Sequence, residues 1–177
     1  MLLVPYDPSW PQRFEEFAAS IRAPGADGWI VEHIGSTAIP GMSAKPIVDL
    51  AVRVQTRGEF DACRSALEAV GWRTGSGIRT HPVMIMEAAG ERLAIAHFFT
   101  AAEWDAAPQR LLRDWLCAHP DDAERYERVK HDAARAAEER NSSYNAAKTA
   151  VIQEIVDRAR AARGLEPVDV YDKRCSP

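Results

Sequence analysis

Hydrophobic positions in the N-terminal part of the chain follow two periods, one typical of helices and one typical of strands. Large apolar side chains recur at helical spacing from Trp10 to Ile21, which predicts a first helix that is capped by Ser9 and ends at about residue 22. Residues 58–70 show the same spacing and end at a glycine, so a second helix is expected there. Between these helices the period changes to two, the spacing of side chains on one face of a strand.

Two stretches between these helices, residues 29–34 and 47–54, are predicted to be strands. The alternation in the second stretch assigns its side chains to two faces of a sheet. The apolar face carries Val48, Leu50, Val52 and Val54, and the other face carries Asp49, Ala51 and Arg53.

A hairpin is predicted after the second helix. Residues 83–87 and 92–99 alternate as strands do, and residues 88–90 form the turn between them. The glycine-rich connection over residues 72–81 is predicted to be irregular. An apolar stripe over residues 104–116 then predicts a helix that ends near Pro120, so the chain becomes helical after the hairpin.

Two further helices are expected in the C-terminal part. A capping box opens one at Asp121, which continues to about residue 138, and Asn141-Ser142 opens another that is followed by Gly164. The pattern predicts an α/β (α+β) fold with a mixed β-sheet flanked by helices and a C-terminal helical segment. The expected divisions are an α/β core over residues 1–100, a helical segment packed on it over 101–164, and a polar tail over 165–177.

Composition and charge exclude several classes of protein. The 177 residues have a formal net charge of −4, which argues against a general nucleic-acid binder, because such proteins carry an excess of lysine and arginine. The sequence has neither an apolar run of about 18 residues nor the pattern of a signal peptide, so we expect no membrane span and a cytoplasmic location. Cys63, Cys117 and Cys175 lack the paired spacing of zinc ligands and are predicted to be reduced thiols.

The loop between the two central strands has the composition of an anion-binding site. Gly35, Ser36 and Lys45 offer an adaptable backbone, a hydroxyl and an ammonium, which together suit a phosphate group. Simpler roles are also open, because Ser36 could cap the next short helix and Lys45 could be a solvated loop residue. His33, just before the loop, could contact the ligand or only fill the second face of its strand.

Asp49 lies between apolar neighbours, where an unpaired carboxylate is costly to bury. It therefore requires a metal ion, an open cleft or a partner such as Arg53. A two-metal site needs a second carboxylate two residues further on, to hold ions about 4 Å apart. That position is Ala51, so the sequence supports at most one Mg²⁺, shared between Asp49 and the phosphates of a ligand.

Two of the C-terminal helical stretches repeat one local pattern, Tyr126 with Lys130 and Tyr144 with Lys148. At a spacing of four, each tyrosine shares a helix face with its lysine. The two pairs could close an anionic site from the helical side. Alternatively, they could be structural, with lysine stems that cover apolar surface and tyrosines that are half-buried.

The segment from His33 to Asp49, His-Ile-Gly-Ser-Thr-Ala-Ile-Pro-Gly-Met-Ser-Ala-Lys-Pro-Ile-Val-Asp, resembles the GrpB family, as does the opening Pro-Tyr-Asp-Pro-x-Trp. That family is related to the extension that follows dephospho-CoA kinase in some bacteria. Its glycine-serine turn and following aspartate are similar to the signature of the nucleotidyltransferase superfamily, which includes DNA polymerase beta. The resemblance reaches about residue 160 and implies a nucleotidyltransferase-like sheet. Arg113 and both tyrosine–lysine pairs match positions of the family.

The resemblance implies that the protein binds a nucleotide or another phosphorylated small molecule. Gly35, Ser36 and Lys45 would hold the phosphates, while Arg113 and the lysines of the C-terminal helices would close the site. Asp49 would position one metal ion or act as a base, if the protein transfers a nucleotidyl group to a small acceptor. The base, the acceptor and the oligomeric state are left open.

Three departures from the family pattern favour an alternative function. Ala51 replaces the second carboxylate, and residues 92–99 contain no acid. Many members show a His-x-His pair in this stretch, whereas the best register places Leu93 and Ile95 at those positions and leaves His97 as its one histidine. The alternative is a non-catalytic module that binds a nucleotide, a coenzyme or a partner and lacks the two-metal site.

Overall fold

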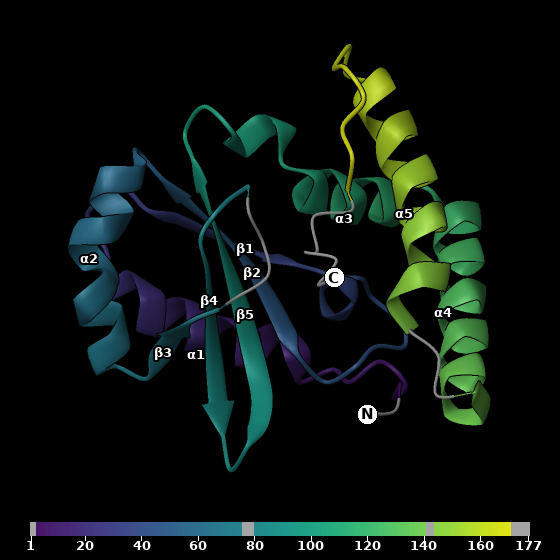
Figure 1. Cartoon of the computed structure of the whole chain (residues 1–177), viewed down its shortest axis with the longest axis horizontal. Coiled ribbons are helices and arrows are strands. Elements are labelled where there is room, and N and C mark those ends of the chain that lie inside the picture. The colour runs from purple at the N-terminus through teal and green to yellow at the C-terminus, as the bar shows by residue number, and fades with distance from the viewer. Residues whose placement is uncertain (1–2, 76–79, 141–143, 171–177) are drawn as a thin grey trace.

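Figure 1 shows the chain, in a computed structural model, as a twisted sheet between two groups of helices. The structure describes residues 3–75, 80–140 and 144–170, and for residues 137–140 and 144–147 it describes only the backbone. None of the described helices combines the length and the apolar character that a membrane span requires.

The described residues form one five-stranded sheet with the strand order β1-β2-β5-β4-β3. The strands β2 and β5 run parallel and the other neighbours are antiparallel, so the sheet is mixed. The predicted fold class, a mixed sheet flanked by helices, is therefore confirmed. The strands are β1 (Ile30–Ile34), β2 (Val48–Val54), β3 (Trp72–Thr74), β4 (Val83–Ala88) and β5 (Glu91–Thr100).

The helices lie in two groups (Figure 1). The first group consists of α1 (Trp10–Arg22) and α2 (Arg57–Ala69), which both contribute to the main hydrophobic cluster on one face of the sheet. The second group consists of α3 (Pro108–Ala118), α4 (Pro120–Arg140) and α5 (Tyr144–Ala161). The 3-10 helix η2 (Trp104–Ala106) connects the sheet to this second group.

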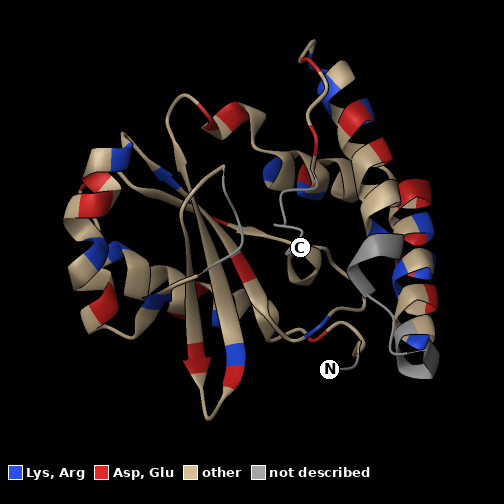
Figure 2. Ribbon diagram, viewed as in Figure 1, with Lys and Arg blue, Asp and Glu red and all other residues tan. Residues whose placement is uncertain are grey.

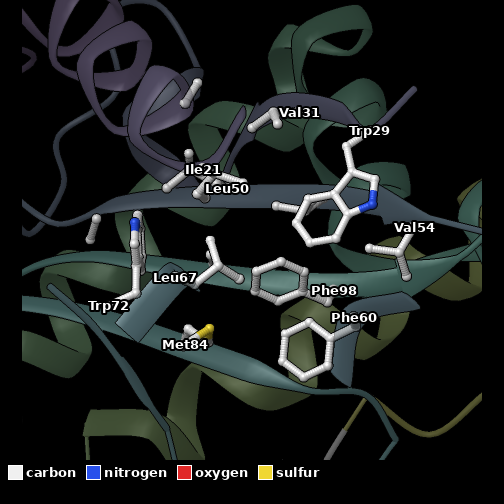
Figure 3. Packing of buried hydrophobic residues seen from close by; sticks show 14 of the residues in the cluster. Ile21, Trp29, Val31, Leu50, Val54, Phe60, Leu67, Trp72, Met84 and Phe98 are labelled. Atoms are coloured by element: carbon white, nitrogen blue, oxygen red, sulfur yellow. The ribbon is translucent and has the colours of Figure 1, made fainter. Parts of the chain in front are cut away.

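The main core contains the apolar face of β2 that alternation predicts. Val48, Leu50, Val52 and Val54 are fully buried there. Figure 3 shows aromatic rings closing this cluster around Phe98, whose ring centre lies 4.6 Å from that of Phe60 and 5.8 Å from that of Trp29. Such tilted and edge-on aromatic pairs add to the stabilisation that burial alone provides.

Two smaller clusters attach the second group of helices to the sheet. In one, Trp104 and Ala107 pack on Ile34, Ala51 and Phe99, on the face of the sheet opposite the main core. In the other, residues of α3, α4 and α5 pack on the loop between β1 and β2: Ile39, Met42, Leu116, Tyr126 and Ile155. The helical segment therefore lies against the same loop that sequence analysis assigns to an anion.

Three local predictions need correction, and a fourth is untested. The side chain of Ser9 makes no cap at α1, and the backbone N–H of Ser9 instead donates to Asp7 Oδ1 at 2.8 Å. The connection after α2 is not wholly irregular, because β3 lies within it, and Trp104 belongs to η2 and not to the helix that follows. The predicted start of α5 at Asn141-Ser142 lies outside the described residues.

The predicted hairpin is confirmed, with its turn one residue shorter than expected. Ala89 and Gly90 join β4 to β5, with φ angles of 50° and 79°. Two successive left-handed residues make the turn whose twist matches that of the strands.

Candidate functional site

Gly35 and Asp49, the two ends of the predicted site, lie in direct contact. Asp49 is the register partner of Ile34, the last residue of β1, so the turn after β1 lies beside the carboxylate. Gly35 has a φ of 72°, and a Cβ at this position would lie 2.3 Å from Asp49 Oδ2. A larger residue cannot adopt this backbone conformation or this approach without strain. The glycine is therefore required both for the turn and for access to Asp49.

The Asp49 carboxylate is half-buried and, within the described part of the chain, takes part in no hydrogen bond or ion pair. The predicted alternative, an ion pair with Arg53, is absent from the described residues. Burial raises the pKa of Asp49 to about 7, while the charges of Lys148 and Arg92 act in the opposite direction. Near neutral pH both forms of the group are therefore populated, the carboxylate that can act as a base and the carboxyl that can donate a hydrogen bond.

Position 51 cannot contribute to a metal site. Ala51 is fully buried under Trp104, Ala107 and Phe99, so a carboxylate there would have to lie in an apolar cluster. Among the residues that the structure describes, no group of three metal-ligating side chains is found. The donor set of the described residues does not fit a resident two-metal centre.

The two lysines of the helical segment converge on one tyrosine. Tyr126 is buried, and its ring centre lies 5.0 Å from the Lys130 ammonium and 6.0 Å from the Lys148 ammonium. Lys130 is 1% exposed, and its ammonium donates to the backbone oxygen of Ser43 at 2.5 Å. Burial, reinforced by the charge of Lys148, lowers the pKa of Lys130 to about 8. Two positive charges thus lie close together behind the loop that leads to Asp49.

Arg113 is held by partners on three sides. Its guanidinium donates to Glu32 at 2.6 Å, to Asp114 at 2.6 Å and to the backbone oxygen of His33 at 2.5 Å. Arg110 donates to the same Glu32 carboxylate at 2.9 and 3.1 Å. The Nε, Nη1 and Nη2 atoms of Arg113 are therefore all hydrogen-bonded. We call the ion-pair cluster of Glu32, Arg110 and Arg113, which joins α3 to β1, the lock.

His33 lies on the face of the sheet opposite Asp49. Its Nε2 is 2.9 Å from Thr37 Oγ1, and its ring stacks on Phe14 with 4.8 Å between ring centres. Burial, together with the charge of Arg113, lowers the pKa of His33 to about 4. Of the two predicted roles, filling the second face of the strand matches this placement, and contact with a ligand at Asp49 does not.

Ser36, Lys45 and Tyr144 are the remaining predicted residues. The N-cap of the 3-10 helix η1 (Ser36–Ala38) is Gly35 and Ser36 is its first residue, so the capping alternative for Ser36 is wrong. Lys45 precedes β2, but the charges that act on the Asp49 pKa come from Lys148 and Arg92. Tyr144 is the first residue of α5, and its side chain lies outside the described residues.

Comparison with known proteins places this arrangement in a family. The model of the GrpB protein family matches residues 1–158. The chain belongs to the GrpB family. A UPF0157 protein of Pseudomonas aeruginosa is 37% identical over 166 residues, which cover 90% of this chain and 68% of that protein. The predicted family is thus confirmed.

A solved structure and an enzyme show further similarity. The crystal structure of the conserved protein GrpB from Enterococcus faecalis matches with a TM-score of 0.81 and 25% identity, covering 92% of this chain and 99% of that one. The dephospho-CoA kinase of Mycobacterium tuberculosis is 30% identical over 177 residues, which cover 82% of this chain and 42% of the kinase. The GrpB fold is therefore shared over most of this chain, and part of the kinase resembles it.

Two side-chain pairings on this face of the sheet were not predicted from the sequence. Glu32 is the register neighbour of Ala51 and receives both arginines of α3, although nothing in its local sequence distinguishes it from a surface acid. His97, the one histidine of β5, lies with its Nδ1 2.8 Å from Nε2 of His81, a residue of the connection that precedes β4. Burial, and next the charge of His81, lower the pKa of His97 to about 3. Both features depend on contacts between segments that are distant in sequence.

Proposed function

We propose that the chain binds a phosphorylated small molecule, such as a nucleotide or a coenzyme, between the Gly35 turn and the lysines of α4 and α5. One observation carries the proposal. Asp49 is a half-buried carboxylate without a hydrogen bond or ion pair in the described residues, it touches the turn, and Lys148 is the charge that acts on it most strongly. A half-buried carboxylate with a strongly raised pKa is commonly part of a functional site.

The charges around the site support an anionic ligand. Burial and then the charge of Lys148 lower the pKa of Lys130, and a phosphate beside the two lysines would offset their repulsion. The protonated Asp49 carboxyl, whose pKa is about 7, could donate a hydrogen bond to a phosphate oxygen. The positive φ of Gly35 leaves the backbone of the turn open to close approach. These groups suit a phosphate better than an uncharged ligand.

A single Mg²⁺ would bind only together with the phosphorylated ligand. Asp49 would be its protein ligand, and the phosphates and water would supply the other oxygens that Mg²⁺ requires. The burial of Ala51 leaves no place for the second ion of a two-metal mechanism. The structure therefore favours the binding module over two-metal nucleotidyl transfer.

Transfer with Asp49 as a base is a second candidate, which the raised pKa of this carboxyl favours. In that reaction the acceptor hydroxyl gives its proton to Asp49, its oxygen forms a bond to the α-phosphorus, and pyrophosphate leaves. Asp49→Ala would then abolish turnover of a nucleoside triphosphate with little loss of folding. Turnover that persists in this variant would remove the carboxylate from the mechanism.

Isothermal titration calorimetry with ATP, CTP and CoA, each with Mg²⁺ and with EDTA, tests the binding proposal. We expect at least one of these ligands to bind. Lys148→Met should weaken the affinity for that ligand about tenfold, the effect of losing one charge-assisted hydrogen bond. Arg64→Met, which removes a charge from the exposed face of α2, is the matched control and should bind normally. Absence of binding for all three ligands, or equal binding by Lys148→Met, would contradict the proposal.

A further inference from the structure

A pocket of about 530 Å³ opens between the sheet, α3, α5 and the chain that follows α5. Phe99 at the end of β5 and the segment 102–108 form one side, and Leu112, Ile152 and Val156 form the other. The side chains that line it are largely apolar. Its size and its lining are those of a site for a small organic molecule.

This pocket is separate from the Asp49 site. None of its lining residues belongs to that site. Phe99 lies four positions beyond Ile95, the register partner of Asp49, which corresponds to roughly 13 Å along the strand. The cluster around Ala51 and Trp104 occupies the same face of the sheet between the two places. A ligand in this pocket therefore needs no contact with the proposed phosphate site.

The charged groups at its edge are already paired. Glu103 accepts from Arg57 at 2.8 Å, and Arg160 donates to two backbone oxygens at 2.6 and 2.8 Å. His81 is hydrogen-bonded at Nδ1 by the Thr80 hydroxyl, at 2.9 Å, and at Nε2 by His97. Pairing of this kind lowers the attraction of these groups for a ligand charge. The lining thus selects for shape and apolar surface rather than for charge.

One wall of the pocket is a segment that folds back beside α5 (Figure 1). We call residues 166–170 the strap. The Gln153 side chain holds it from both sides, because its amide donates to the Val168 oxygen at 2.7 Å and accepts from the Val170 N–H at 2.9 Å. Val168 and Val170 both line the pocket. Arg160 of α5 also holds the strap, since its Nε donates to the Glu166 oxygen at 2.6 Å, but Gln153 is the side chain that binds the part of the strap that carries the two valines.

We propose that this pocket binds an uncharged, largely hydrocarbon small molecule, over which the strap closes. Such a molecule would cover apolar side chains of β5, residues 102–108, α3, α5 and the strap. Removing this apolar surface from water is what would drive binding. Gln109, which also lines the pocket, has a buried side-chain oxygen without a hydrogen-bond partner in the described residues. A rotation of its amide would offer one acceptor, so the ligand can carry one N–H or O–H donor.

Fluorescence titration with N-phenylnaphthylamine, an uncharged aromatic amine, tests the proposal on the full chain. We expect saturable enhancement with one site per chain. Ala106→Trp fills the pocket and should weaken binding at least about tenfold. Ala66→Trp on the exposed surface of α2 is the matched control and should bind as the parent chain does. Circular dichroism establishes that each variant is folded, and Ala102→Trp at the pocket edge replaces Ala106→Trp if that variant is not.

The strap has its own test. Gln153→Leu keeps the approximate size of the side chain and removes both of its hydrogen bonds to the strap. It should therefore weaken binding of the probe about fivefold or more. Probe binding that is absent from the parent chain, or equal in the filled and parent chains, would overturn the proposal. Binding that appears only after residues 171–177 are removed would show that the chain's own end takes the pocket, and would also overturn it.

Discussion

At the scale of single residues, the contact between Gly35 and Asp49 determines what the site can do. The glycine brings the backbone of the turn against the carboxylate, and the carboxylate has no hydrogen bond or ion pair among the described residues. Burial without a partner raises its pKa to about 7. The same burial that prepares Asp49 for a ligand therefore destabilises the free protein at high pH, when the group is charged.

Asp49→Asn should stabilise the protein at pH 8 and have little effect at pH 4. The folded-state pKa of Asp49 lies above the unfolded value of 3.8, so the native state binds the extra proton and stability falls as the pH rises from about 4 to about 7. We expect a gain on the order of 2 kcal/mol at pH 8, after allowance for partial exposure. Urea unfolding at both pH values measures it. A loss of stability at pH 8 would show that Asp49 has a stabilising partner.

Gly35→Ala should destabilise the protein by about 3 kcal/mol or more, for two reasons. The new Cβ would clash with Asp49 Oδ2, and the alanine would have to adopt a positive φ. Gly41→Ala is the matched control, since Gly41 also has a positive φ, of 78°, but nothing lies within 4 Å of its Cβ position. It should lose only about 1 kcal/mol. Urea unfolding of the two variants compares them directly, and equal losses would mean that the contact with Asp49 contributes nothing.

At the scale of elements, the lock between α3 and β1 fixes one wall of the site. Glu32 on β1 receives Arg110 and Arg113 from α3. Although burial opposes it, hydrogen bonds from these two arginines hold the pKa of Glu32 below its usual range. The helix is thereby attached next to the position of Ala51, which Trp104 and Ala107 cover. The lock keeps that position closed.

Glu32→Gln should cost about 2 kcal/mol of stability, because two partly buried guanidiniums lose their shared negative partner. The side chains are only 27%, 12% and 19% exposed for Glu32, Arg110 and Arg113. Glu15→Gln breaks the exposed pair with Arg22 and, as the control, should cost less than about 1 kcal/mol. Thermal unfolding of the two variants provides the comparison. A Glu32→Gln variant as stable as the control would indicate that the lock is dispensable.

The elements themselves were largely predictable from the sequence, whereas their contacts were not. Alternation in β2 correctly assigned Val48 to the core and Asp49 to the opposite face, because the period of two is a local property. The short strand β3 was missed because its three residues carry too little pattern. Glu32 and His81 were missed because their partners lie in distant segments, and Lys130 matched a family position whose burial no local pattern shows.

At the scale of the whole molecule, α3, α4 and α5 pack on the loop between β1 and β2 through an apolar cluster that includes Tyr126. This packing brings Lys130 and Lys148 to one tyrosine ring and buries the first of them. In Figure 2, α4 carries both signs of charge along its length, while the sheet is mostly uncharged. The two lysines are thus a local feature, suited to a small anion and not to a long polyanion.

The pKa of Lys130, followed by NMR of the lysine side chains, tests the central claim most directly. In the free protein we expect a pKa of about 8, because burial and the charge of Lys148 both lower it. When the ligand identified by calorimetry is added to saturation, its phosphate should raise this pKa, since an adjacent negative charge favours the charged ammonium. A Lys130 pKa that stays the same with and without bound ligand would contradict the claim that these lysines face its phosphate.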